Sequence, residues 1–294
     1  MVSNDQAWRR LPGAPARAET LPAWARRLAG PLPRTTALML ELDAAHRTGD
    51  RLDPALRARM RGAAADANHC TYAKAAAEAD LRRADATDAK ILPEPERLAV
   101  AFARQLTEDA AAVTDEEVAR LVELHGDATV VAMVALVAHA CFQDRMLLAL
   151  DPSVEPDGPP PPIAAHFPHT RSPAGPPPTT AVPVLATGPN LGPTDPAWRA
   201  KSFADLQAGL EWQRERPARV RIPDWKEVDA RVGPDSWVRR WPRVVWGRVC
   251  YAHQPDVTDL WFDTVDAFRQ ESGMDRLLQQ DIFWVVTRAL DCFY

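Results

Sequence analysis

The two halves of the chain carry the same short pattern, and this repeat limits the chain to folds that can be built twice. Residues 51–72 align over residues 273–294 without a gap. The identical pairs include Asp53 with Asp275, Ala67 with Ala289, Cys70 with Cys292 and Tyr72 with Tyr294. A shorter match relates residues 24–28 to residues 237–241. We therefore expect two copies of one helical unit, with the second copy ending inside its motif.

Length and charge indicate a chain of up to two domains and argue against a nucleic-acid-binding or membrane protein. At 294 residues the chain can hold two domains that each bury a core. Its net charge of −5 comes from acidic and basic residues that are mixed along the sequence, which argues against a nucleic-acid surface or a polybasic membrane patch. The N-terminus lacks the apolar core of a signal peptide. The longest apolar run, residues 130–142, is too short to span a bilayer and is expected to form a buried helix.

The cysteines indicate a reducing compartment. Their spacing is not typical of secreted disulfides: Cys70, Cys141, Cys250 and Cys292. We therefore expect a cytoplasmic protein without a membrane or nucleic-acid partner.

A proline-rich stretch divides the sequence. Residues 151–197 contain 15 of the 28 prolines, and proline removes backbone donors and favours extended geometry. Eight of the ten tryptophans follow this stretch, which indicates separate cores on its two sides. The sequence predicts a helical domain over residues 20–150, a semi-rigid linker over 151–197 and a second, partial helical domain over 198–294.

Helical signals occur in both halves, and no segment alternates apolar and polar residues as a half-buried strand does. Helix boundaries are indicated at Asp53-Pro54, at the capping box of Thr114 and Glu117, at Gly126 and at Asp127. Apolar spacing predicts further helices near residues 35–46, 224–231, 258–270 and 275–291. The predicted fold class is all-α.

Cys70 is the first candidate for chemistry. It precedes an alanine-rich helical stretch, so its thiol is expected at a helix N-terminus, where backbone amides and the helix dipole favour the thiolate. Lys74, one turn further on, could add a cation. The alternative is that Cys70 is packing material, as lone cysteines beside apolar residues commonly are.

An ordered set of segments extends this interpretation. The segments are Leu52–Arg57, Asn68–Tyr72, Pro95–Ala103, Val113–Glu117 and Cys141–Arg145. Together they resemble the carboxymuconolactone decarboxylase and alkyl hydroperoxidase D superfamily, over roughly residues 20–150 and again over 235–294. The resemblance implies an all-helical fold that forms oligomers, often trimers or hexamers. In the peroxidase branch it also implies a Cys-x-x-Cys pair, a glutamate twelve residues before the first cysteine and a histidine four after the second.

The first copy departs from that pattern. Ala73, Ala77 and Ala58 stand where the resemblance implies the second cysteine, the histidine and the glutamate. Without a partner thiol, Cys70 cannot form the local disulfide that discharges a sulfenic acid, and a proton relay is missing. We expect the first domain to be catalytically degenerate. Asp144-Arg145 replaces an Asn-Arg pair of the family, and a helix-terminal ion pair explains these two residues equally well.

The second copy retains Cys292 and carries Gln280 at the glutamate position. Its partner cysteine would directly follow Tyr294. Four explanations stay open: a stop codon translated as selenocysteine, a frameshift, a shortened form of the protein, or coincidence. The predicted last helix has an apolar face, formed by Leu278, Ile282, Val285 and Ala289, that should pack into a second core yet leave apolar surface exposed.

Other motifs are weak. The histidines have no metal-site spacing, those at 166 and 169 fall in the proline-rich stretch where we expect them to be solvated, and no phosphate-binding loop occurs. We expect no cofactor and no metal. Trp237, Trp241 and Trp246 are interpreted as core residues, with an aromatic ligand surface as the alternative.

Two functions from different classes remain. One is a thiol-dependent peroxidase or disulfide oxidoreductase, an antioxidant enzyme that acts through Cys292 once its motif is completed, with Cys70 as a vestigial redox position. It would be a homo-oligomer supplied by a thiol electron-donor protein. The other is a non-catalytic helical scaffold for oligomerisation or partner binding. Lactone decarboxylation ranks third, because no cationic and histidine cluster for an acidic substrate is evident.

Overall fold

The fold is built from helices. The computed structural model describes residues 3–87, 91–172 and 217–289, together with residues 202, 204–205, 207–208 and 211. No strand occurs among these residues, so the predicted all-α class is confirmed at that level. The contacts group the chain into two units, Met1–Arg171 with Arg219–Gly273, and Ser172–Ala218 with Met274–Tyr294.

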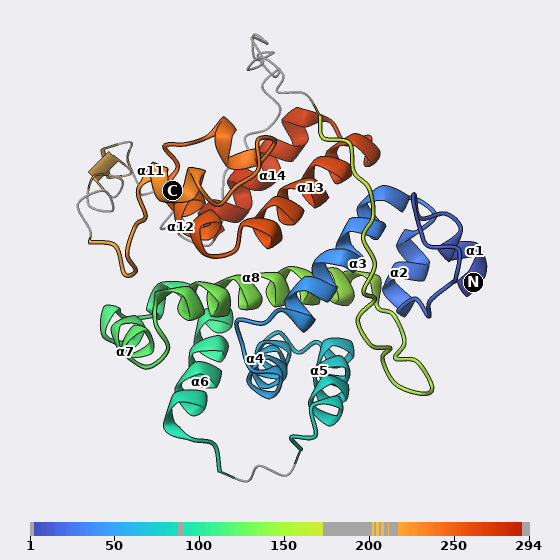
Figure 1. Ribbon diagram of the computed structural model, residues 1–294, viewed down its shortest axis with the longest axis horizontal. Helices are drawn as coiled ribbons and strands as arrows, with labels where there is room; N and C mark the ends of the chain where they lie inside the picture. The colour runs from blue at the N-terminus through green and yellow to red at the C-terminus, as the bar shows by residue number, and fades with distance from the viewer. Residues whose placement is uncertain are drawn as a thin grey trace. The chain divides into compact units, whose positions relative to one another are not determined.

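The first 150 residues form most of the larger unit. Their elements are α1 (Asn4–Trp8), α2 (Ala23–Leu28), α3 (Pro33–Thr48), α4 (Pro54–Ala67), α5 (Thr71–Arg83), α6 (Glu94–Glu108), the 3₁₀ turn η1 (Ala110–Ala112), α7 (Asp115–His125) and α8 (Asp127–Leu150). The long helix α8 packs against α4, α5, α6 and α7, and α4 packs against α5 and α6 (Figure 1). The core of this unit therefore lies around α4 and α8.

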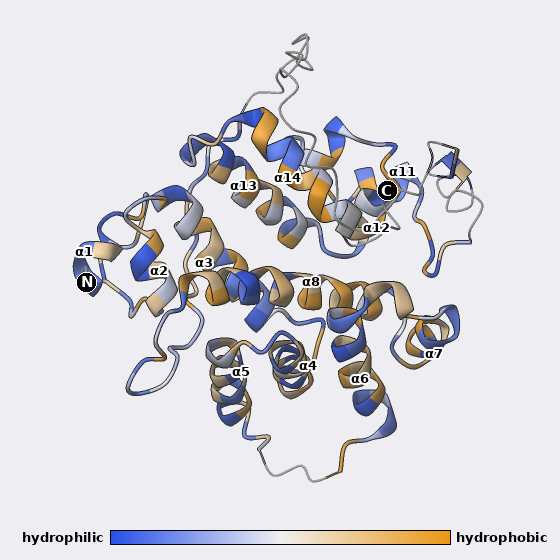
Figure 2. Ribbon diagram, turned by 180° about the vertical axis from the view of Figure 1, so that it is seen from behind, coloured by the Kyte–Doolittle hydropathy of each residue, from blue (hydrophilic) through white to orange (hydrophobic). Residues whose placement is uncertain are grey.

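Helix α8 carries apolar residues along most of its length, with polar residues between them (Figure 2). By length and composition alone it could cross a membrane, but 61% of its apolar window is buried inside the structure. Val130, Met133 and Val137 pack with residues of α4, α6 and α7 in one cluster. This burial agrees with the sequence interpretation of residues 130–142 as a buried helix.

Residues 219–273 belong to the same unit as the first eight helices, whereas the sequence placed them in a second domain beyond residue 198. Their elements are α11 (Trp225–Asp229), the 3₁₀ turn η2 (Trp237–Arg240), α12 (Val245–His253) and α13 (Pro255–Glu271). Helix α13 packs along α3, and Trp261 of α13 meets Phe142 of α8 edge to face at 5.1 Å between ring centroids. The pairing of α3 with α13 joins the two sequence halves.

The tryptophans of the small aromatic cluster in this region differ in burial. Trp237 is buried with Val238 and Tyr251, as predicted for a core residue. Trp241 and Trp246 are exposed, at 42% and 44%, so the interpretation of these two as core residues was wrong. Both rings contact Phe262.

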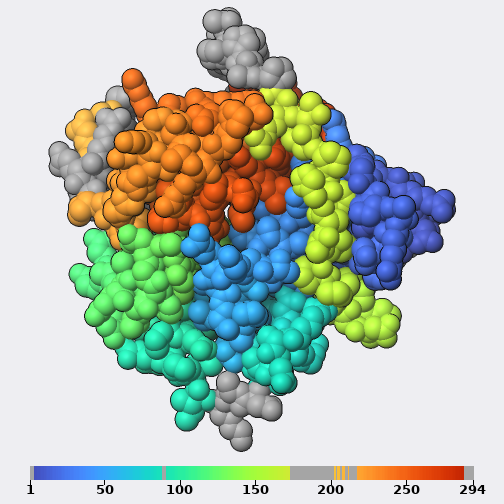
Figure 3. Space-filling model, in the orientation of Figure 1, coloured from blue at the N-terminus to red at the C-terminus, as the bar shows by residue number. Residues whose placement is uncertain are grey.

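The described part of the proline-rich stretch, residues 151–172, has no regular secondary structure and runs over the surface beside α1 to α3 (Figure 3). It also packs, because Ile163 and Phe167 are buried in the cluster formed by α1, α2 and α3. His169 is not solvated as the sequence suggested; its Nε2 lies 3.1 Å from Asp266, and its side chain is buried. His166 is exposed and contacts Glu41. Residues 173–197 lie outside the described residues.

Most of the predicted helix boundaries are confirmed. Asp53 caps α4 by accepting from the N–H groups of residues 55 and 56, and Thr114 forms a capping box with Glu117. Gly126 ends α7 with φ 77°, a left-handed value that glycine adopts without strain. One detail differs, since Gly126 rather than Asp127 is also the N-cap of α8.

The internal repeat reappears in the spacing of the helices. Helices α2, α3 and α4 begin at residues 23, 33 and 54, and helices α12, α13 and α14 (Arg276–Ala289) begin 222 positions later, at 245, 255 and 276. Helices α4 and α14 both have 14 residues. This constant spacing pairs Trp24 with Trp246, instead of with Trp237 as the shorter sequence match suggested.

Candidate functional site

Cys70 lies where the sequence placed it, at the N-cap of α5. The preceding residue, His69, has φ 56°, and this left-handed turn brings the chain from α4 into α5. The Cys70 N–H donates to the carbonyl of Ala65 at 2.8 Å, which fixes the cysteine against the end of α4. The residue is only 3% exposed, and it packs in the cluster of α1, α2 and α3.

The surroundings of Cys70 favour the thiol over the thiolate. Burial raises the pKa of Cys70, and the backbone N–H groups of Ala73 and Tyr72 oppose this only in part. The carboxylate of Asp144 raises the pKa further. The predicted cation does not help, because Lys74 is exposed and its Nζ pairs with Asp66 at 2.7 Å. Cys70 is therefore not an activated nucleophile in this structure.

Asp144 forms a contact that the sequence did not predict. It is 1% exposed and accepts a hydrogen bond from Nδ2 of Asn68 at 2.9 Å. Arg145 instead donates to the carbonyl of Cys141, so the two neighbours form no ion pair among the described contacts. Burial raises the pKa of Asp144 to about 6, although the Asn68 hydrogen bond lowers it in part. In the sequence Asp144 is flanked by Gln143 and Arg145, so no local pattern indicated its burial.

The positions that would carry redox chemistry in this copy are filled by small apolar residues. Ala58, Ala73 and Ala77 are all buried. Beside Ala73 lies a cavity of about 10 Å³, room for about one water molecule. The described residues thus leave no space for a substrate at this point.

That cavity borders a buried charge cluster of α3, α4 and α5 that sequence reasoning missed. Arg47 contacts Asp80 through two parallel hydrogen bonds of 2.8 Å and Asp43 through a third of 2.8 Å. Arg61 pairs with Asp80 at 2.6 Å, and Gln143 donates to Asp43 at 3.0 Å. Burial alone would raise the pKa of Asp43, but Arg47 and Arg61 outweigh it and lower that pKa. The cluster joins three helices and α8, which is a structural role.

Cys292 lies outside the described residues, so the structure does not place it. The helix before it, α14, begins as predicted: Oδ1 of Asp275 accepts from the N–H groups of Leu277 and Leu278 at 2.9 and 3.2 Å. Leu278, Ile282 and Val285 are exposed rather than packed, so the predicted apolar surface is present.

The histidines form no metal site in the part of the chain that the structure describes. His46 and His139 stack at 4.4 Å between ring centroids, and burial lowers the pKa of His139 to about 3. His125 contacts the carbonyl of Pro95. These contacts are packing interactions.

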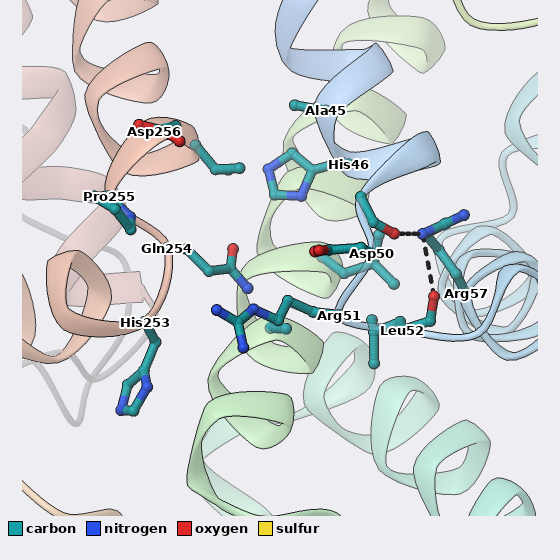
Figure 4. A pocket seen from close by; sticks show the side chains of 14 residues that line it. Ala45, His46, Asp50, Arg51, Leu52, Arg57, His253, Gln254, Pro255 and Asp256 are labelled. Atoms are coloured by element: carbon teal, nitrogen blue, oxygen red, sulfur yellow. Dashed lines mark hydrogen bonds between the residues drawn. The ribbon is translucent and has the colours of Figure 1, made fainter. Parts of the chain in front are cut away.

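A larger cavity, which the sequence did not indicate, lies in the same unit between α3, α8 and α13. Its volume is about 340 Å³. The polar side chains that line it include His46, Asp50, Arg51, Arg57 and Gln254 (Figure 4). It is larger than the cavity beside Ala73.

No family model, no curated protein and no solved structure matches this chain.

Proposed function

We propose that the helical unit of residues 1–171 and 219–273 is a non-catalytic scaffold related to the alkyl hydroperoxidase D type, in which Cys70 serves packing. The observation that carries this proposal is the site of Cys70: the thiol is 3% exposed and its pKa is raised, mainly by burial. The alanines at 58, 73 and 77 supply neither a second thiol nor a proton relay. Homo-oligomerisation is part of this proposal, as the family resemblance implies.

The test is the reactivity of the cysteines in the folded chain. Native protein is treated with iodoacetamide, and the modified cysteines are identified by mass spectrometry. Cys70 should stay unmodified until the protein is unfolded, whereas the half-buried Cys141 serves as the matched control and reacts before Cys70. Rapid modification of Cys70, or a loss of peroxide consumption in Cys70→Ser, would contradict the scaffold proposal.

A second candidate, a thiol-dependent peroxidase or disulfide oxidoreductase, is favoured by the match between α4 and α14. Both helices have 14 residues and an aspartate cap of the same geometry. Cys292 follows α14 at the same distance as Cys70 follows α4. The proposed reaction is attack of the Cys292 thiolate on a peroxide, which breaks the O–O bond, releases an alcohol or water and leaves a sulfenic acid. A thiol electron donor then reduces the sulfenic acid to the thiol and is itself oxidised to a disulfide.

This candidate is tested with hydrogen peroxide as oxidant and dithiothreitol as reductant. In a form of the chain lengthened by a cysteine after Tyr294, which completes the Cys-x-x-Cys pair, we expect peroxide consumption that Cys292→Ser abolishes and Cys70→Ser leaves unchanged. Equal rates in both variants and in the parent chain would contradict the assignment of redox chemistry to Cys292.

A further inference from the structure

The first turn of α3 holds a carboxylate from the opposite end of α13. The N–H groups of Arg34 and Thr35 donate to the two oxygens of Glu271, each at 2.7 Å, and the hydroxyl of Thr35 adds a third bond of 2.7 Å. Helices α3 and α13 therefore pair with the C-terminus of one against the N-terminus of the other. A carboxylate here satisfies two of the free N–H groups of the first turn and interacts favourably with the helix dipole.

The first turn of α13 has the same backbone as that of α3. Both helices begin with proline, at Pro33 and Pro255, after a residue with nearly equal torsion angles: φ −136° and ψ 60° at Leu32, φ −143° and ψ 63° at Gln254. The N–H groups of Asp256 and Val257 are the repeat equivalents of those of Arg34 and Thr35. Within the described residues, neither of these two N–H groups has a hydrogen-bond partner.

Gly49 explains why no side chain accepts hydrogen bonds from the N–H groups of Asp256 and Val257. The repeat places Gly49 where the other copy has Glu271. Gly49, at the C-terminus of α3, supplies no carboxylate, and a Cβ added there would lie 2.9 Å from the carbonyl oxygen of Ala45. The cavity of about 340 Å³ lies at this point, lined by Gly49 on one side and by residues 254–257 on the other.

The cavity is lined by both apolar and polar side chains. Apolar surface comes from Ala45, Leu52, Ala132, Leu136 and Pro255. Figure 4 shows His46, Asp50, Arg51 and Gln254 pointing toward one another across the space. A volume of this size falls in the range of small-molecule sites, which combine apolar walls with a few polar groups.

Two arginines at the cavity lack a carboxylate partner. Arg57 is 7% exposed, and its guanidinium donates to the carbonyls of Gly49 and Leu52, without an ion pair in the described part of the chain. Arg51 is exposed and makes no hydrogen bond or ion pair there. The carboxylates of Asp80 and Asp53 compensate the charge of Arg57 in part, because they raise its pKa against the lowering effect of burial. The exposed Arg51 is therefore the positive charge that is available to a ligand. The acidic residues are Asp50, across the cavity, and Asp256, which is exposed at its edge.

We propose that this cavity binds a small organic carboxylate. Its carboxylate accepts hydrogen bonds from the N–H groups of Asp256 and Val257, as Glu271 does at the N-terminus of α3, and the apolar part of the ligand lies against Leu52, Ala132 and Leu136. Arg51 supplies the nearest free positive charge. This site does not involve Cys70 or Cys292, and it does not depend on the proposed function.

The experiment is a titration of the full chain followed by amide nuclear magnetic resonance, with sodium butyrate and sodium benzoate as probes at constant ionic strength. We expect saturable shifts of the Asp256 and Val257 amides. The amides of Arg34 and Thr35 are the internal control, because Glu271 already occupies them, and they should not shift.

Substitutions at two exposed residues should change the affinity for the probes in opposite directions. Arg51→Gln should weaken binding about two- to fivefold, because it removes one exposed charge interaction. Asp50→Asn should strengthen binding, because it removes a negative charge that faces the ligand. Both side chains are exposed, so neither change should affect folding.

Three results would overturn the proposal: no saturable shift in the millimolar range, equal shifts at α3 and α13, or no change of affinity in either variant. Inorganic phosphate is the comparison probe. If phosphate binds at least as tightly as butyrate or benzoate, the assignment to an organic carboxylate is wrong.

Discussion

Helices α4 and α14 have the same length and the same aspartate cap, yet they differ in their surroundings. Helix α4 packs against α5, α6 and α8, so Leu56 and Met60 are buried. Their repeat equivalents on α14, Leu278 and Ile282, are 50% and 46% exposed. The comparison shows that local sequence signals set where a helix starts and ends, whereas burial depends on which other elements pack against it.

The polar residues of the two copies have diverged as well. Arg61 in the buried charge cluster of α4 corresponds to Phe283 of α14, which is 70% exposed. The first turn of α3 holds Glu271, whereas the first turn of α13 faces a cavity. In the first copy, Arg61 and the N–H groups at the start of α3 have partners within the unit. In the second copy, the N–H groups at the start of α13 lie at a cavity.

The largest expected effect concerns the charge cluster. Arg61→Ala should lower the free energy of unfolding by about 3–5 kcal/mol, because it leaves Asp80 and Asp43 buried with one cation fewer. Phe283→Ala, at the equivalent position of the repeat, is the matched control and should change it by less than about 0.5 kcal/mol. Urea unfolding measures both. Equal losses in the two variants would show that the copies are buried alike.

The second effect depends on pH. The pKa of Asp144 is about 6 in the folded state and near 4 when unfolded, so its favourable contribution is present below about pH 4 and is lost as pH rises through about 6. Asp144→Asn should therefore stabilise the protein by about 1–3 kcal/mol at pH 8 and by little at pH 4.

The control for this pH dependence is Asp66→Asn, which removes the exposed ion pair with Lys74. It should have an effect of about 0–1 kcal/mol at either pH. Urea unfolding at the two pH values measures both variants. A loss of stability of Asp144→Asn at pH 8 would mean that Asp144 is favourably ionised.

The third effect concerns the carboxylate at α3. Glu271→Gln should lower the free energy of unfolding by about 1–2 kcal/mol, because it weakens the capping of Arg34 and Thr35 and removes a charge from the helix N-terminus. Asp256→Asn at the equivalent turn of α13 is the control, with a change below about 0.5 kcal/mol because its side chain is exposed. Thermal unfolding is sufficient to compare them. A larger effect at Asp256 would reverse the distinction between the two turns.

The smallest effect concerns the two aspartate caps. Asp53→Ala should cost about 1 kcal/mol in global unfolding, since α4 is part of the core. Asp275→Ala removes the same hydrogen bonds, but it should reduce only the helicity of α14 and leave the global midpoint unchanged. Circular dichroism during urea unfolding distinguishes the two outcomes. If both variants shift the midpoint equally, α14 unfolds together with the larger unit.

The sequence predicted the parts of the fold that depend on short-range interactions. The helix class, the caps at Asp53, Thr114 and Asp275, and the position of Cys70 at a helix start are all confirmed. Long-range contacts were harder to predict. The burial of His169 against Asp266 and the grouping of residues 219–273 with the first helices involve partners about one hundred positions or more apart. No local pattern encodes such pairs.

The candidate site was likewise predicted only where it depends on residues close together in the sequence. The sequence identified Cys70 and the alanines around it, and the inference of a degenerate first site rests on those residue types alone. It did not identify Asn68 as the partner of Asp144, the charge cluster of Arg47 and Arg61, or the cavity beside Gly49. Each of these joins side chains from two or more helices.

By itself, the sequence determined where the helices begin and that one helical pattern occurs twice, because caps and apolar spacing act within one or two turns of the chain. Only the tertiary structure decided that Cys70 is buried and that Glu271 reaches the first turn of α3. It also decided that the matching turn of α13 opens into a cavity. The physical reason is that desolvation and ion pairing depend on which distant helices meet, and repeated segments meet different neighbours.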